Sequence, residues 1–191
     1  MSILAGIFIG IGGIVYLSVG GVCGALLFAV GLLTICHFKY ALFTGKTGFV
    51  LTGEIKISEI LRIWLGNFVG TFIAASLAIW SGKSVALYSM AAALVDTRWA
   101  NGPIVNLCLG IFCGMLMYVA VTGYAETKNV LFVFVPVAVF ILSGFNHCVA
   151  DMFYLHLAAM NVSDYAVLVP TTIGNLIGGA TLGYCRKFWS F

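Results

Sequence analysis

The chain has 191 residues, of which 62% are hydrophobic and 8% charged, and its mean hydropathy is +1.13. Soluble domains carry about 25% charged residues, so this composition excludes a water-soluble domain and predicts an apolar surface in lipid. The formal net charge of +3 is small and scattered along the chain, which argues against a nucleic-acid-binding protein. A membrane β-barrel needs alternating segments of about ten residues, whereas the apolar runs here are longer and do not alternate.

Apolar runs of about 17–25 residues are typical of helices that cross a membrane. The second run of this chain is interrupted by "HFKYALFTGKTG" and the fifth by "SGFNH". The stretch 82–103 is mildly apolar and predicts either a short interfacial helix or a lead into the fourth span. The start of the chain lacks a basic segment before its first run, so we expect a span there and not a signal peptide. The six predicted spans cover about 3–19, 21–51, 60–81, 104–124, 130–160 and 166–184.

Two short segments of the first half recur in the second half in the same order. "AGIFIGI" at 5–11 resembles "LGIFCGM" at 109–115, and "GNFVGTF" at 66–72 resembles "GNLIGGA" at 174–180. A unit with three crossings must be inserted upside down the second time. In folds of this kind, a broken helix in each half places a solute site near the bilayer midplane.

We therefore predict one all-α membrane domain over 1–191, built from two inverted three-helix repeats at about 1–82 and 104–187. Spans two and five would be the broken ones. The glycines of the repeated segments are spaced as in closely packed membrane helices. We expect Asn67 and Asn175 to form hydrogen bonds between helices.

The basic residues favour one orientation. Six spans place both termini on one side of the membrane, and the positive-inside rule assigns the more basic side to the cytoplasm. We therefore expect a multi-pass protein of the cell (inner) membrane with both termini cytoplasmic. The terminal side holds Lys56, Arg62, Lys128, Arg186 and Lys187, and the opposite side holds Lys83 and Arg98.

The segment "SGFNHCVADMFYL" at 143–155 places His147 and Asp151 in an otherwise apolar run. A carboxylate in the membrane interior is costly unless something compensates its charge. Two readings stay open for Asp151: it is paired with Lys39, Arg98 or His147 itself, or it caps the second half of span five.

The cysteines suggest no redox or metal chemistry, because none forms a CxxC pair and no histidine lies at zinc-ligand spacing. We expect them to be small buried hydrophobes, and we expect no metal and no cofactor. The cysteines are Cys23, Cys36, Cys108, Cys113, Cys148 and Cys185.

These motifs resemble the formate/nitrite transporter family nearly end to end. "AGIFIGIGG" resembles the first-span signature of the family, and "ALFTGKTG" resembles its E/D-L-F-T-G/S loop. "CLGIFCGMLMYVAV" resembles its fourth span and "GNLIGGATLGY" its sixth. "PVAVFILSGFNHCVADMFYL" resembles the segment P-I-x-x-F-x-x-x-G-F-E-H-x-x-A-N-M-F. The chain looks like a short and divergent member.

The resemblance implies an aquaporin-like protomer, a homopentamer with one pore per protomer, and passage of small monovalent anions such as formate, nitrite, hydrosulfide, acetate or lactate. It implies a channel or transporter and not an enzyme. By motif position, His147 corresponds to the central pore histidine of the family and Thr44 to the loop threonine facing it. Leu42 and Phe43 correspond to apolar constriction residues, and we expect Phe145 to add to the constriction.

The physics of anion passage asks for such groups independently of any family. Broken helices expose backbone N–H groups and helix N-termini, both of which attract anions. Thr44 supplies a neutral hydroxyl donor. His147 can donate a hydrogen bond or hand a proton to a weak acid, because the unperturbed pKa of histidine lies near physiological pH. Dry apolar constrictions exclude hydrated ions.

This chain departs from the family pattern at several positions. Ala41 and Asn146 stand where the family has acidic residues, and Gly114 stands where it has an asparagine. Arg98 replaces a lysine, Asp151 replaces an asparagine, and Lys39 is an unusual basic residue. The predicted pathway residues are His147, Thr44, Leu42, Phe43, Phe145, Asn146 and Gly114, and the residues predicted to tune the electrostatics are Arg98, Lys39 and Asp151.

Three functions remain to be compared. The first is a channel for small monovalent anions in a lipid bilayer, either passive or proton-coupled through His147. The second is an aquaporin-like conduit for a neutral solute or for ammonium and ammonia, which Asp151 and the loss of the family's asparagine at Gly114 make plausible. The third is a membrane enzyme or metal-handling protein that uses His37, His147, His156 and cysteines.

Overall fold

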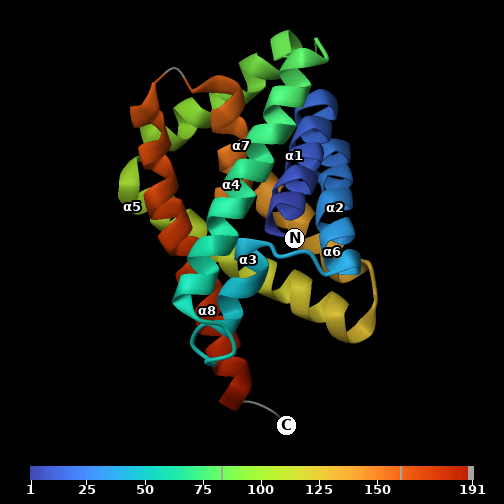
Figure 1. Ribbon diagram of the computed structural model, residues 1–191, viewed down its shortest axis with the longest axis vertical. Coiled ribbons are helices and arrows are strands. Elements are labelled where there is room, and N and C mark those ends of the chain that lie inside the picture. Colours follow the sequence, from blue (N-terminus) through green and yellow to red (C-terminus); the bar gives the residue numbers. More distant parts are fainter. Residues whose placement is uncertain (83, 160, 189–191) are drawn as a thin grey trace.

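The computed structural model describes residues 1–82, 84–159 and 161–188, which form helices joined by short turns (Figure 1). In lipid, every backbone polar group has to be satisfied inside the protein, and a helix does this within its own segment. The elements are α1 (Ser2–Val19), α2 (Gly21–Phe38), α3 (Phe43–Lys46), the 3₁₀ turn η1 (Thr47–Phe49), α4 (Ile57–Trp80), α5 (Ser84–Thr127), α6 (Leu131–Leu142), α7 (Cys148–Ala158), η2 (Val162–Val167) and α8 (Leu168–Phe188).

The predicted all-α membrane fold is confirmed. Four helical segments of the described chain are long and apolar enough to cross a bilayer, namely Ser2–Val19, Ile57–Trp80, Leu87–Thr127 and Val162–Phe188. The shorter apolar helices are Gly21–His37, Leu131–Leu142 and Cys148–Ala158. The last two are the halves of the interrupted fifth span, and the count of six spans itself remains a prediction.

The stretch 82–103 is largely helical and leads into the fourth span. It forms the first part of α5, which bends at Gly102, where φ is 70° and ψ is 175°. A positive φ is readily adopted only by glycine, and Pro103 can begin the second part because the first turn of a helix needs no N–H donor there. Lys83 and the expected end of the fifth span at Met160 lie outside the described residues.

Close helix packing through glycine fixes the frame around the two broken spans. A Cβ atom added at Gly70 would lie 2.1 Å from the Ile3 carbonyl oxygen, which brings α4 against α1. A Cβ atom at Gly178 would lie 2.0 Å from the Ile111 carbonyl oxygen, which brings α8 against α5. The predicted packing role of these glycines is confirmed. Figure 1 shows α1 beside α2 and α4, with the short α3 lying between the lower ends of α2 and α4.

Candidate functional site

The first helix break follows α2. Lys39 takes the left-handed conformation, with φ 57°, and its backbone N–H donates to the Ile35 carbonyl oxygen. The Tyr40 N–H donates to the same oxygen at 2.9 Å, which ends the helix. The chain then runs extended through Leu42, and α3 begins at Phe43. The sequence "ALFTG" therefore forms a turn into a short second helix.

The second helix break follows α6 and has the same construction. Gly144 has φ 69°, and the Phe145 N–H donates to the Phe140 carbonyl oxygen at 2.9 Å. The helix resumes as α7 at Cys148, directly after His147. Both predicted interruptions are thus real helix breaks, and each begins a new helix whose first backbone N–H groups need acceptors outside the backbone of that helix.

Asn67 and Asn175 hold these two helix starts in place. The Phe43 N–H donates to Asn67 Oδ1 at 2.8 Å, and the Cys148 N–H donates to Asn175 Oδ1 at 2.9 Å. Each amide nitrogen also donates to two backbone carbonyl oxygens, one of which belongs to the break itself. Asn67 bonds Ser2 and Ala41, and Asn175 bonds Gly110 and Asn146. The prediction that both are interhelical hydrogen bonders is confirmed.

Thr44 and His147 meet where the two half-helices begin. The Thr44 hydroxyl oxygen lies 2.8 Å from His147 Nε2, although the residues are 103 positions apart. Both side chains are buried, with exposed fractions of 0% and 1%. The structure therefore brings together the two residues that the motif placed at the pore centre.

The second ring nitrogen of His147 defines how this pair shares its protons. The Ala150 backbone N–H donates to His147 Nδ1 at 3.1 Å, so the imidazole caps the start of α7. Nδ1 is then an acceptor, and in the neutral ring Nε2 carries the hydrogen. Nε2 donates to the Thr44 oxygen, which leaves the Thr44 O–H hydrogen for a further acceptor such as a solute oxygen. The Phe140 ring stacks on the imidazole at 5.5 Å.

Asp151 is paired with Arg98. The Arg98 Nε atom lies 3.3 Å from Oδ1 and 3.4 Å from Oδ2 of the carboxylate, and both side chains are buried. Of the three partners considered from sequence, the structure selects Arg98. The capping alternative does not hold, because His147 caps α7 and Asp151 lies within the helix.

Two cavities lie near the Thr44–His147 pair, one lined by chain neighbours of Thr44 and the other by His147. The first, of about 240 Å³, is lined by Leu42 and Gly45 beside Thr44 and by Lys39; we call it the lysine cavity. The second, of about 260 Å³, is lined by His147 together with other residues from α1, α5, α6 and α7; we call it the arginine cavity. Its polar lining includes Arg98 and Asp151.

The remaining predicted residues lie around these features. Phe145 lines the arginine cavity and stacks on Phe112 at 5.1 Å. Phe43 lines a different, apolar groove between α4 and α8. Asn146 is buried and donates to Asn106 Oδ1 at 2.8 Å. Gly114 packs against the backbone of Asn175, where an added Cβ atom would lie 2.3 Å from the carbonyl oxygen.

Sequence reasoning missed three contributors to the site. Lys46 and Lys128 join Lys39 in the lining of the lysine cavity. Lys46 lies in the quoted "LFTGKTG" motif, which was a usable signal, whereas Lys128 was counted only for orientation. Asn106 donates to the Arg98 carbonyl oxygen at 2.6 Å and links the bend of α5 to the second helix break. Its only sequence signal was its position just after Gly102.

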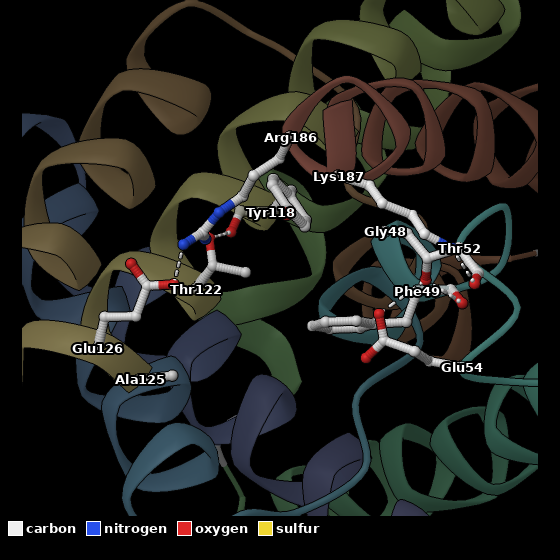
Figure 2. A pocket seen from close by; sticks show the side chains of 11 residues that line it. Gly48, Phe49, Thr52, Glu54, Tyr118, Thr122, Ala125, Glu126, Arg186 and Lys187 are labelled. Atoms are coloured by element: carbon white, nitrogen blue, oxygen red, sulfur yellow. Dashed lines mark hydrogen bonds and ion pairs between the residues drawn. The ribbon is translucent and has the colours of Figure 1, made fainter. Parts of the chain in front are cut away.

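A further cavity of about 450 Å³ lies where η1, the end of α5 and the end of α8 meet (Figure 2). Two of its charged groups pair with each other: Arg186 points toward Glu126 and forms an ion pair with it. Lys187 donates to the Thr52 carbonyl oxygen at 3.2 Å. None of the predicted site residues lines this cavity. Within the described ranges, no group of three His, Cys, Asp or Glu side chains is placed to hold a metal ion.

Several proteins of known sequence are similar to this chain. The formate channel FocA of Haemophilus influenzae is 27% identical over an alignment of 201 residues, which covers 82% of this chain and 69% of that protein. Formate channel FocA of Escherichia coli K12 is 27% identical over 239 residues, which cover 95% of this chain and 82% of that protein. The formate-nitrite transporter of Plasmodium vivax is 28% identical over 239 residues, which cover 100% of this chain and 75% of that protein. These relatives are channels or transporters and not enzymes.

Solved structures agree with the sequence comparison. A structure described as a pentameric formate channel with formate bound superposes with a TM-score of 0.81 at 26% identity, covering 98% of this chain and 93% of that chain. A structure described as an FNT family ion channel superposes with a TM-score of 0.81 at 24% identity and supports the fold. The superposition covers 100% of this chain and 88% of that chain. A family model described as "Formate/nitrite transporter" matches residues 1–189. The chain therefore belongs to the formate/nitrite transporter family.

Proposed function

We propose that this chain is a membrane channel for small monovalent anions of weak acids, with formate and nitrite as the first candidates and hydrosulfide as a further one. The observation that carries the proposal is the Thr44–His147 hydrogen bond at 2.8 Å, located where two half-helices begin. One cavity is lined by His147 and another by Leu42 and Gly45 on either side of Thr44. Preorganised O–H and N–H donors suit an anion that has lost its water.

The proposed pathway runs from the lysine cavity past Leu42 to the Thr44–His147 pair and then into the arginine cavity. Leu42 is 2% exposed and lies next to the pair, so it would act as an apolar constriction on one side. Phe145, half-buried in the lining of the arginine cavity, would do so on the other side. Hydrated ions are disfavoured at such constrictions, whereas a small anion or its protonated acid can pass.

We propose two ways in which His147 can act, because its geometry allows both. As a neutral donor it holds Thr44, and the Thr44 hydroxyl contacts the solute. As a proton donor it gives up the Nε2 proton, and the weak acid crosses as a neutral molecule. The second route requires Thr44 to give way, since Nε2 faces its hydroxyl oxygen.

The assembly and orientation are also proposals. A similar solved structure is described as pentameric, and we propose a homopentamer with one pathway per protomer. The lysine cavity is lined by Lys128, which belongs to the loop side that carries most basic residues. By the positive-inside rule this side faces the cytoplasm, together with both termini, in the cell (inner) membrane.

Uptake into proteoliposomes tests the proposal. The purified full chain should carry formate, nitrite or hydrosulfide and leave ammonium and urea outside. Uptake of ammonium or urea without any of these anions would favour the aquaporin-like alternative. One of the two arguments for that alternative is weakened, because Asp151 is paired with Arg98 and is not a free carboxylate for a cation.

A further inference from the structure

The two cavities near the Thr44–His147 pair differ in charge. The lining of the lysine cavity includes Lys39, Lys46 and Lys128 and, in the described part of the chain, no carboxylate. The lining of the arginine cavity includes one cation, Arg98, and one carboxylate, Asp151. An anion therefore meets uncompensated positive charge on one side of the pair and compensated charge on the other.

The compensation in the arginine cavity is close and desolvated. Arg98 Nε contacts both oxygens of Asp151 at 3.3 and 3.4 Å. The side chains are 9% and 4% exposed, so little water screens them. At the distance of a solute in the cavity, the electrostatic fields of two opposite unit charges in contact largely cancel. The field of an isolated buried cation extends over many ångströms.

We infer that Asp151 is a specificity-determining residue that cancels the positive charge of Arg98, so that anions are captured from the lysine cavity and only weakly from the arginine cavity. The inference rests on the proposed anion-channel function. Like-signed side chains lining a cavity raise the local concentration of the opposite ion. From the arginine side, uptake then depends more on the uncharged acid, which the paired charges neither attract nor repel.

The wild-type protein already gives a test that needs no variant. Initial uptake of labelled formate is measured in right-side-out and inside-out membrane vesicles from the same cells, which present opposite faces to the solution. The half-saturating formate concentration should be lower in vesicles that present the lysine cavity to the outside. Equal values for the two faces would overturn the inference while leaving the anion channel intact.

Asp151→Asn tests the residue directly. Asparagine keeps the size of the side chain and an oxygen that can accept from Arg98 Nε, so Arg98 stays buried but its charge is no longer cancelled. The half-saturating formate concentration for uptake from the arginine side should fall by roughly threefold or more, with little change from the lysine side. Asp96→Asn is the matched control: it removes the same charge from an exposed position on α5 outside the cavity lining and should leave uptake unchanged.

The double variant Arg98→Gln with Asp151→Asn separates charge from shape. It removes both charges, and the half-saturating formate concentration from the arginine side should return to the wild-type value. If the double variant keeps the lowered half-saturating concentration of Asp151→Asn, or if Asp151→Asn accumulates normally and has the wild-type value from both faces, the inference is wrong. If wild-type protein carries no anion from either face, the proposed function itself is wrong.

Discussion

His147 Nε2 lies 2.8 Å from the hydroxyl oxygen of Thr44, and this hydrogen bond joins the beginnings of two helices that come from opposite halves of the chain. Asn67 and Asn175 fix the backbone on either side of it. A buried polar pair held from both sides is preorganised, so a solute oxygen can bind without reorganisation of the protein.

Replacing Thr44 by valine keeps the shape of the side chain and removes the hydroxyl. If this hydroxyl contacts the anion, formate uptake should fall by roughly tenfold or more, since a hydrogen bond to a charged group contributes about 1.5–3 kcal/mol. Thr44→Ser should restore uptake. Thr34→Val serves as control, because the Thr34 hydroxyl donates only to the Val30 carbonyl oxygen of its own helix. Equal uptake by Thr44→Val and wild type would remove Thr44 from the pathway.

His147→Asn separates proton transfer from the structural role of the ring. Asparagine is a good N-cap residue and can accept the Ala150 N–H in place of Nδ1, so α7 should still begin at Cys148. If His147 hands protons to weak acids, the increase of formate uptake on acidification should disappear in this variant. A variant whose uptake still increases on acidification as in wild type would leave His147 with a structural role alone. The measurement is initial uptake over a series of external pH values.

Asn175→Ala should destabilise the fold. It leaves the Cys148 N–H without its acceptor and takes the amide donor from the Gly110 and Asn146 carbonyl oxygens. An unsatisfied buried polar group costs about 1–3 kcal/mol, and the thermal midpoint in detergent should fall by several degrees. Ser18→Ala, which removes an exposed hydroxyl bonded within α1, should change the midpoint little. Midpoints that match for the two variants would contradict the anchoring role of Asn175.

Gly178→Ala tests the close approach of α8 to α5. The added methyl group would lie 2.0 Å from the Ile111 carbonyl oxygen, so one helix has to move. Gly24→Ala is the milder comparison, because its nearest atom outside its own helix is 3.2 Å away. We expect less folded protein and a lower thermal midpoint for Gly178→Ala than for Gly24→Ala. The reverse order would show that the α5–α8 contact tolerates a larger separation.

A large part of this site could be predicted from the sequence, because the interrupted apolar runs and the internal repeat are visible in it. The interruptions at "ALFTGKTG" and "SGFNH" break long apolar runs, so the positions of the two helix breaks follow from hydropathy alone. The internal repeat paired these breaks with each other, and the motif placed Thr44 opposite His147. Asn67 and Asn175 occupy matching positions in the repeat, which indicated that they share a role.

The partner of Asp151 could not be chosen from the sequence. Lys39, Arg98 and His147 all lay in candidate positions, and the choice depends on how α5 bends at Gly102 and turns the Arg98 side toward α7. The bend of a helix decides toward which neighbouring helix each of its side chains points, and the local sequence does not specify that direction. The lysine cavity was missed for a similar reason, because Lys39, Lys46 and Lys128 come together only through the positions of α2, α3 and the end of α5.

The most direct test of the anion channel is an electrical one. Purified protein in a planar bilayer separates two solutions that differ in formate concentration and are otherwise matched, and the reversal potential is measured. The account predicts a potential close to the Nernst value for formate that shifts little when the cation is exchanged, together with a strongly reduced current for Thr44→Val. A reversal potential that follows ammonium would contradict an anion channel, and a potential that remains at zero in a formate gradient would exclude passage of the formate anion itself.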